Sequence, residues 1–205
     1  NKSPLKRIYA GIGATLGWTA LILQMYLLLA NRTISVPESI LRYFSYFTIL
    51  TNLLAAVSFT AVCLRSSGKL FFARSLTLSA VTVYILIVGI VYNVILRSLW
   101  DPRGLQLFVD EFLHTAQPLL FLLFWLLFVP KKELQWRHAF NWLLYPVAYI
   151  IYLMIMGAIT GFYPYPFADV NKLGYMTAML NGVLIIAAFL VLSLLLIGAA
   201  RIRSR

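Results

Sequence analysis

Long apolar stretches alternate with short polar segments along this chain. Six stretches stand out, at residues 8–30, 43–64, 76–96, 112–129, 140–160 and 175–200. Each supplies about the 20 apolar residues that a helix needs to cross a bilayer core of roughly 30 Å. The first stretch is too long for the apolar part of a signal peptide and precedes no small-residue cleavage site, so we expect it to be retained. The pattern predicts an all-α integral membrane protein with six transmembrane helices, forming a single domain over residues 1–205.

Composition agrees with this pattern. Hydrophobic residues make up 62% of the 205 residues and charged residues only 11%, a balance unlike that of soluble globular domains. The connections are too short to fold on their own. A single cysteine, Cys63, permits no intramolecular disulfide and is expected to be a small packing residue.

Lysine and arginine are distributed unevenly among the connections. Twelve lie at the N-terminus, in the second-to-third and fourth-to-fifth connections and at the C-terminus: Lys2, Lys6, Arg7, Arg65, Lys69, Arg74, Lys131, Lys132, Arg137, Arg201, Arg203 and Arg205. The other five are Arg32, Arg42, Arg97, Arg103 and Lys172. Because basic residues remain on the cytoplasmic side, we expect both termini to be cytoplasmic. The net charge of +11 then reflects topology and anionic phospholipid headgroups at that face, and needs no nucleic acid partner.

The acidic residues have the opposite distribution. Glu133 belongs to the cytoplasmic set, and the other five lie in the predicted outer segments: Glu38, Asp101, Asp110, Glu111 and Asp169. Acidic residues contribute little to topology. They therefore belong either to solvated loops or to a site that opens outward.

The second apolar stretch carries polar residues in its outer half. Ser45, Thr48 and Asn52 are spaced i, i+3 and i+7, which places them on one face of a continuous helix, with Thr51 beside them. One interpretation is structural: hydroxyls bond back to their own helix and Asn52 bridges to a neighbour. The other is that this polar stripe lines a site.

The fourth apolar stretch begins with a histidine near two carboxylates. Asp110 and Glu111 precede His114 by four and three residues, so either can approach the imidazole. A carboxylate bonded to one ring nitrogen fixes the tautomer and leaves the other nitrogen as a base. Pro118 cannot donate to the His114 carbonyl, so we expect a helix irregularity there. The alternative is an ordinary interfacial histidine.

The second histidine, His138, lies in the basic cytoplasmic connection and is predicted to be a surface residue. Two histidines on opposite sides of the membrane, without a cysteine cluster, do not supply the usual ligands of a zinc, di-iron or haem site. We therefore expect no metal and no other cofactor.

The last outer connection is stiff and aromatic. Tyr163 and Tyr165 alternate with Pro164 and Pro166, which favours an extended segment at the level of the lipid headgroups. Such a segment serves either as an interfacial belt or as a rigid lid over an outer cavity.

Three short motifs together resemble a known family. They are Phe47-Thr48 followed by a Leu/Asn run, His114-Thr115 followed by Pro118, and Gly161 followed by Tyr165-Pro166-Phe167. The chain resembles the androgen-induced and androgen-dependent six-helix membrane proteins and their bacterial relatives. The animal members are threonine hydrolases of fatty acid esters of hydroxy fatty acids. The resemblance implies a multi-pass protein of the bacterial inner membrane that acts on a membrane lipid or fatty acyl ester.

Carried over by position, the resemblance implies that Thr48 is the nucleophile and His114 the catalytic histidine. The chain departs from the animal pattern in two places. The step from His114 to Pro118 is one residue shorter, and Thr51 occupies the position of an acidic residue that follows the nucleophilic threonine in the animal proteins. The bacterial branch is closer to this sequence. A threonine hydroxyl needs a base within hydrogen-bond reach, and His114 is the only histidine on the predicted outer side.

We therefore expect hydrolysis of a lipid ester near the outer leaflet. The residues predicted to support catalysis or contact substrate are Asp110, Glu111, Ser45, Thr51, Asn52, Tyr163 and Tyr165. The oxyanion donor stays open among Asn52, Tyr46 and the hydroxyls of the last outer connection. The alternative is a non-enzymatic lipid-binding or transport protein with an outward-facing cavity, although a transporter more usually carries a mid-membrane ionisable residue or an internal repeat. The oligomeric state is not predicted.

Overall fold

The computed structural model describes residues 2–64 and 70–203, and this part of the chain contains helices and no strand. Six of its helices are long and apolar enough to cross a membrane: Pro4–Ala30, Phe47–Leu64, Ser75–Leu99, Leu105–Phe128, Arg137–Thr160 and Val170–Ile202. The predicted all-α class and the six apolar helices are confirmed. Three residues of the basic set, Arg65, Lys69 and Arg205, lie outside the described residues.

The regular elements follow one another in chain order. The α-helices are α1 (Lys2–Ala30), α2 (Val36–Ser45), α3 (Phe47–Leu64), α4 (Ser75–Val91), α5 (Leu105–Glu111), α6 (Gln117–Phe128), α7 (Arg137–Asn141), α8 (Leu144–Thr160) and α9 (Val170–Arg203). Two π-helical turns continue α4 and α5, namely η2 (Tyr92–Leu96) and η4 (Phe112–Ala116). Three short 3₁₀ turns complete the list: η1 (Phe71–Ala73), η3 (Arg97–Leu99) and η5 (Pro166–Ala168).

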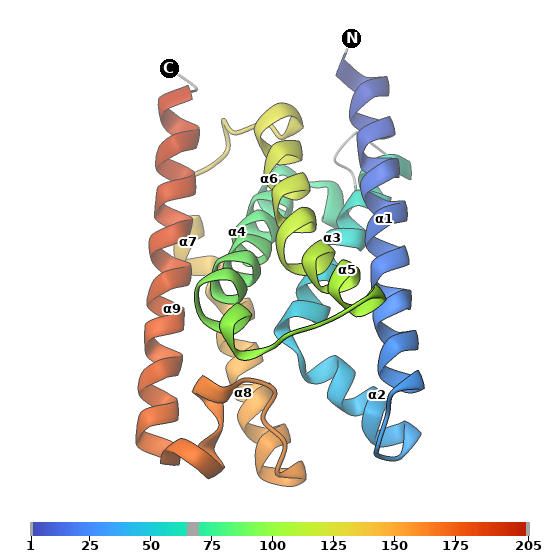
Figure 1. Cartoon of the computed structure of the whole chain (residues 1–205). Helices are drawn as coiled ribbons and strands as arrows, with labels where there is room; N and C mark the ends of the chain where they lie inside the picture. Colours follow the sequence, from blue (N-terminus) through green and yellow to red (C-terminus); the bar gives the residue numbers. More distant parts are fainter. Residues whose placement is uncertain (1, 65–69, 204–205) are drawn as a thin grey trace.

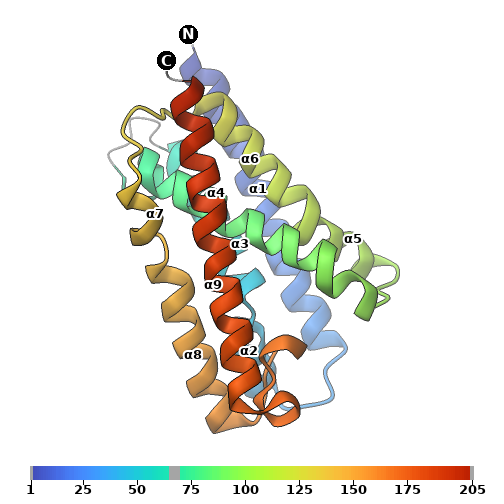
Figure 2. The ribbon, with the colours of Figure 1, turned by 90° about the vertical axis from the view of Figure 1, so that its left-hand side faces the viewer.

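The long helices run side by side, and both termini lie at the same end of the bundle (Figures 1 and 2). The opposite end holds α2, the C-terminal end of α8 and the connection from α8 to α9. We call it the α2 end. In both views the connection from α4 to α5 stops short of the α2 end.

The helix α1 packs closely on its neighbours through two glycines spaced four residues apart. A Cβ atom on Gly13 would lie 2.7 Å from the Phe59 ring, and one on Gly17 would lie 2.9 Å from Gln117 Nε2. Phe59 is fully buried and packs against Phe121 with ring centroids 4.8 Å apart. Small residues at this spacing let membrane helices approach closely, so these glycines set the separation of α1 from α3 and α6.

The second apolar stretch is broken, contrary to the prediction of one helix over 43–64. The helix α2 ends at Ser45, Tyr46 is extended (φ −81°, ψ 125°), and α3 begins at Phe47. In a continuous helix the Ser45 carbonyl would accept the Ile49 amide. Here it accepts the Tyr149 hydroxyl at 2.7 Å, while the Ile49 amide bonds to Tyr46 O at 3.1 Å.

The break also corrects the predicted polar stripe. Thr48 and Asn52 share α3, but Ser45 belongs to α2, where its hydroxyl bonds back to Leu41 O at 2.9 Å. The prediction that Ser45 lies on one helix face with the other two is therefore wrong.

Two further expectations are settled near the histidines. The irregularity expected beside Pro118 is the π-helical turn η4, which immediately precedes α6. The prediction that His138 is a surface residue is wrong: it is only 9% exposed, and its Nδ1 accepts the Gln135 amide at 3.0 Å. This bond stabilises the start of the helical segment, and the His138 ring also stacks beside Trp142 with centroids 6.4 Å apart.

The close approach of α1 to α3 predicts a destabilising substitution. Gly13→Ala places a methyl group into the buried Phe59 ring, so we expect the free energy of unfolding to fall by about 1–3 kcal/mol, the usual cost of overpacking. The measurement is the thermal unfolding midpoint in detergent. The matched control is Gly198→Ala in α9, where a Cβ would meet only Trp136 at 3.6 Å. Equal midpoints for the two variants would contradict the prediction.

Candidate functional site

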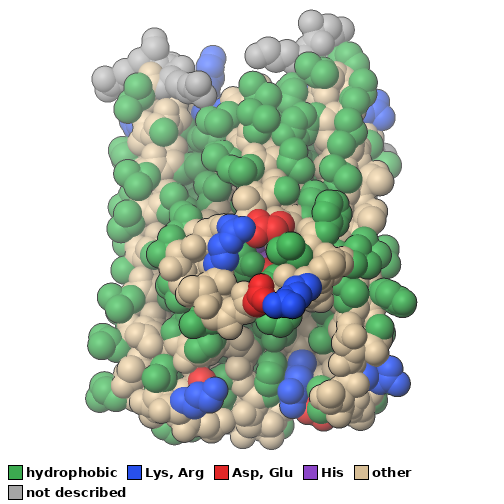
Figure 3. Space-filling model, viewed as in Figure 1, with side chains coloured by type: hydrophobic (Ala, Val, Ile, Leu, Met, Phe, Trp, Pro, Cys, Tyr) green, Lys and Arg blue, Asp and Glu red, His purple; other side chains and the backbone are tan. Residues whose placement is uncertain are grey.

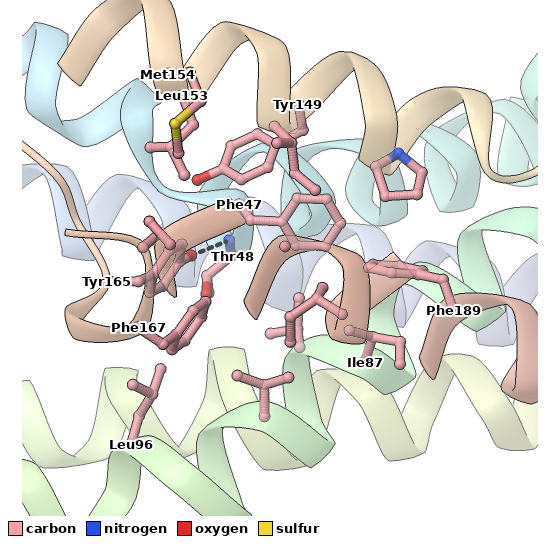
Figure 4. Close-up of a pocket in the computed structure, with 18 of the residues that line it drawn as sticks. Phe47, Thr48, Ile87, Leu96, Tyr149, Leu153, Met154, Tyr165, Phe167 and Phe189 are labelled. Carbon is pink, nitrogen blue, oxygen red and sulfur yellow. Dashed lines mark hydrogen bonds between the residues drawn. The ribbon is translucent and has the colours of Figure 1, made fainter. Parts of the chain in front are cut away.

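Two cavities meet near the α2 end of the bundle. The larger, which we call the vestibule, has a volume of about 850 Å³. Figure 3 shows acidic and basic side chains gathered around a hollow on the face where α4 connects to α5. The smaller, which we call the apolar cavity, has a volume of about 70 Å³ and lies among α3, α4, α8 and α9 (Figure 4). Both cavities are lined by Thr48, Leu96, His114 and Tyr165.

Thr48 is the second residue of α3, so its backbone N–H has no acceptor within the helix. The Tyr165 hydroxyl accepts this N–H at 3.3 Å, as the dashed line in Figure 4 marks. The threonine is 7% exposed, and its exposure is to the cavities that it lines. The N-terminus of a helix carries partial positive charge. Negative charge that develops beside Thr48 is therefore stabilised by the helix itself.

Tyr165 is held in place by the connection from α8 to α9. Its ring stacks on Phe167 with centroids 5.2 Å apart and meets Tyr46 edge-on at 6.0 Å. The Asn181 side chain in α9 donates to Phe167 O at 2.8 Å. Burial raises the pKa of Tyr165 to about 12, although hydrogen bonds from Thr48 act in the opposite direction. The phenol consequently keeps its proton at neutral pH and remains a donor.

The same connection covers the site. Phe162, Pro164, Tyr165 and Pro166 line the vestibule, and Tyr165 and Phe167 line the apolar cavity. The segment predicted to be a belt or a lid therefore forms a wall of both cavities.

His114 is oriented by the backbone and the side chain of Asp110. Its Nδ1 lies 2.9 Å from Asp110 O and 3.3 Å from Asp110 Oδ1. Both partners are acceptors, so Nδ1 carries the proton and Nε2 is left as the basic nitrogen. The imidazole stacks on the Tyr92 ring with centroids 4.1 Å apart and planes 19° apart. These contacts fix the ring at the junction of the two cavities.

Asp110 is itself held by two aromatic donors. It is 7% exposed, and its Oδ2 accepts the Tyr92 hydroxyl and, at 3.4 Å, Trp100 Nε1. Of the two carboxylates that sequence spacing left open, Asp110 is the one that contacts His114. Sequence reasoning missed Tyr92 and Trp100, because an aromatic residue near a helix end carries no signal that distinguishes it from the many others here.

Glu111 belongs to a different network. It pairs with Arg97 and accepts the Thr115 hydroxyl at 3.2 Å. Asn93 in η2 donates to that same hydroxyl at 3.3 Å and accepts from Arg97 at 2.6 Å. Glu111 lines neither cavity. Its contacts join the end of α4 to the start of the next span.

Asn52 connects α3, which carries Thr48, to η4, which carries His114. Its Nδ2 donates to Thr48 O at 2.9 Å and to Leu113 O at 3.1 Å. The π-helical turn directs the Gln117 amide to Phe112 O, which leaves Leu113 O open to this bond. Both amide hydrogens of the fully buried Asn52 are therefore engaged, which removes it from the candidate oxyanion donors.

The other predicted site residues lie away from both cavities. Ser45 has the helix contact given above, and Thr51 Oγ1 lies 3.3 Å from the Tyr145 hydroxyl. Tyr163 packs against α8, where its ring occupies the space that a Cβ on Gly157 would take. Their contacts are structural.

Among residues 2–64 and 70–203, no three His, Cys, Asp or Glu side chains lie close enough together to hold a metal ion. A threonine hydroxyl, an oriented imidazole and a tyrosine hydroxyl line both cavities. No protein-family model, curated protein or solved structure matches the chain.

Proposed function

We propose that this protein hydrolyses lipid esters within the membrane, with Thr48 as nucleophile and His114 as base. The observation that carries the proposal is the position of both residues at the junction of an apolar and a polar cavity. The ester of a fatty acyl chain joins an apolar part to a more polar part. A substrate such as a fatty acid ester of a hydroxy fatty acid therefore suits this junction.

In the first half of the proposed reaction, Thr48 Oγ attacks the ester carbonyl carbon and its proton passes to His114 Nε2. The carbonyl oxygen becomes an oxyanion, for which the N-terminus of α3 and the protonated Tyr165 hydroxyl provide stabilisation. Collapse of this intermediate breaks the bond to the alcohol oxygen. The alcohol leaves with the proton from His114, and the acyl group remains on Thr48.

In the second half, water enters from the vestibule and attacks the acyl-threonine. His114 takes the proton from the water and then returns it to Thr48 Oγ as the fatty acid leaves. The Asp110 carboxylate stabilises the imidazolium that forms in each half and keeps Nδ1 protonated. Tyr92 is a positioning residue, because it contacts both Asp110 and His114.

The three motifs that resemble the androgen-induced and androgen-dependent proteins add to this proposal. We propose a bacterial-type member of that family, located in the inner membrane with both termini cytoplasmic. Membrane lipid or fatty acyl esters would be its substrates, and anionic headgroups would contact its cytoplasmic face.

The pair of candidate catalytic residues predicts a non-additive loss of activity. Thr48→Ala and His114→Ala should each lower kcat for a long-chain ester by roughly 10⁴-fold or more, and the double variant should be little worse than either. Thr48→Ser retains a hydroxyl and should keep part of the activity. The measurement is ester hydrolysis by purified protein in liposomes.

Thr51→Ala is the matched control for these variants, because it removes a buried threonine hydroxyl that lines neither cavity. A Thr48→Ala variant with the full hydrolytic rate would refute the proposal. Wild-type protein that binds esters and never cleaves them would favour the alternative of a lipid-binding or transport protein.

The two neighbouring carboxylates predict different effects on hydrolysis. Asp110→Asn disturbs the contact that orients His114 and should lower kcat by about 10²-fold or more. Glu111→Gln should stay within about fivefold of wild type, because its ion pair with Arg97 is partly exposed and contributes about 1 kcal/mol at most. Thermal unfolding of both variants controls for stability. Equal losses in the two would remove Asp110 from its proposed role.

The proposed topology has its own test. A reporter protein fused after Arg205 should be active only in the form that works in the cytoplasm, because basic residues cluster at the end that holds both termini. The control is the same reporter placed after Asp101, in the connection predicted to be external. An active external reporter at the C-terminus would reverse the sidedness of the site.

A further inference from the structure

The apolar cavity is elongated along the bundle. In α9 it is lined by Ala178, Gly182, Ile185 and Phe189, which are spaced as one face of a helix. At 1.5 Å per residue this face is roughly 16 Å long. Figure 4 places Thr48 and Tyr165 toward one end of the cavity and Phe189 toward the other.

The lining is almost entirely hydrocarbon away from the catalytic end. Beyond the two candidate catalytic residues, the hydroxyls in the lining belong to Tyr149 and Tyr165, and Tyr149 already donates to Ser45 O. Apolar cavities exclude water and bind apolar molecules. With a volume of about 70 Å³, this one is too narrow for a sterol or for two chains side by side.

Gly182 keeps the middle of the cavity open. A Cβ there would meet only Ile150 Cδ1, at 3.7 Å. The backbone at this position is helical, so no left-handed conformation requires glycine. The absence of a side chain at Gly182 therefore makes the cavity wider at this point.

Phe189 closes the far end. It is 2% exposed, and its ring packs against Phe47 at 5.6 Å and Tyr84 at 6.1 Å. Phe47 and Phe189 both line the cavity, and Tyr84 packs behind Phe189.

We infer that the apolar cavity holds one unbranched acyl chain, with its carbonyl end at Thr48 and its methyl end toward Phe189, and that Gly182 determines which chain lengths enter. This inference rests on the proposed function for the placement of the carbonyl end. Because the volume of about 70 Å³ leaves room for only a few methylene groups, the lining side chains move apart as a longer chain enters. The lining is roughly 16 Å long, which matches roughly twelve methylene groups at about 1.3 Å each along an extended chain. A side chain at position 182 stops the chain after about four or five of them.

The test combines hydrolysis with chemical cross-linking. Wild-type protein, Gly182→Leu and the control Gly198→Leu are given matched esters with four-carbon and twelve-carbon acyl chains. In parallel, each protein carrying Thr48→Ala, which removes turnover, is irradiated with a twelve-carbon fatty acid analogue that has a photoreactive diazirine at mid-chain. Cross-linked residues are then mapped by mass spectrometry.

We expect the wild-type background and Gly198→Leu to cross-link in α8 and α9 near Ile150 and Ile185. Gly182→Leu should lose this cross-link and hydrolyse the long ester at least about tenfold more slowly, because several methylene groups lose their buried site. Its rate with the short ester should remain within about threefold of wild type. Gly182→Ala adds one methyl group and should also lower the ratio of the long-ester rate to the short-ester rate. This variant keeps the test available if the leucine variant folds poorly.

The outcomes separate this inference from the proposed function. Cross-linking that Gly182→Leu abolishes, without hydrolysis in any variant, supports the acyl cavity and refutes the hydrolase. Hydrolysis with an unchanged ratio of long to short esters in Gly182→Leu and Gly182→Ala supports the hydrolase and overturns the acyl cavity. Cross-links confined to residues that do not line the cavity, in the wild-type background, overturn it as well.

Discussion

The break in the helix at Tyr46 is the constraint on which the site depends. A membrane interior offers no water to unpaired backbone groups, so a broken helix persists there only if other groups satisfy them. The Tyr149 hydroxyl donates a hydrogen bond to the Ser45 carbonyl, and the Tyr165 hydroxyl accepts one from the Thr48 amide. One local interruption thereby brings α8, the connection after it and the start of α3 to a single point. Thr48 lies at that point, on a helix N-terminus that favours negative charge.

A second irregularity positions the histidine. The π-helical turns η2 and η4 contact each other, and the stacked rings of Tyr92 and His114 come from these two turns. The same turn in η4 leaves Leu113 O open for Asn52, whose other bond is to Thr48 O. Departures from regular helix in three spans are thus linked by side-chain hydrogen bonds. The relative position of Thr48 and His114 follows from this linkage, and neither helix could shift without breaking it.

The fold was largely predictable, and the site only in part. Six apolar stretches of spanning length are enough to predict six helices, because bilayer thickness sets their length. No proline or glycine beside Tyr46 indicates the break in the sequence. The break is stabilised instead by two hydroxyl groups more than 100 residues away along the chain. For the same reason the spacing of Ser45, Thr48 and Asn52 predicts a single helix face that the break divides. Helical spacing allowed either carboxylate to reach His114, and only the tertiary contacts of Tyr92 and Trp100 select Asp110.

The two cavities explain where the proposed reaction would take place. Water can reach the site only from a polar space, whereas the acyl part of a lipid is stable only in an apolar one. A bond that joins the two parts must lie where those spaces meet, and the residues that line both cavities are Thr48, Leu96, His114 and Tyr165. Three of these four carry a hydroxyl or an imidazole, although most of the apolar cavity is hydrocarbon. Other buried polar residues, such as Ser79 and Thr82, pack against protein, whereas Thr48, His114 and Tyr165 face the space where the two cavities meet. Polar groups in a membrane protein that face a cavity are commonly functional, which supports the proposed chemistry.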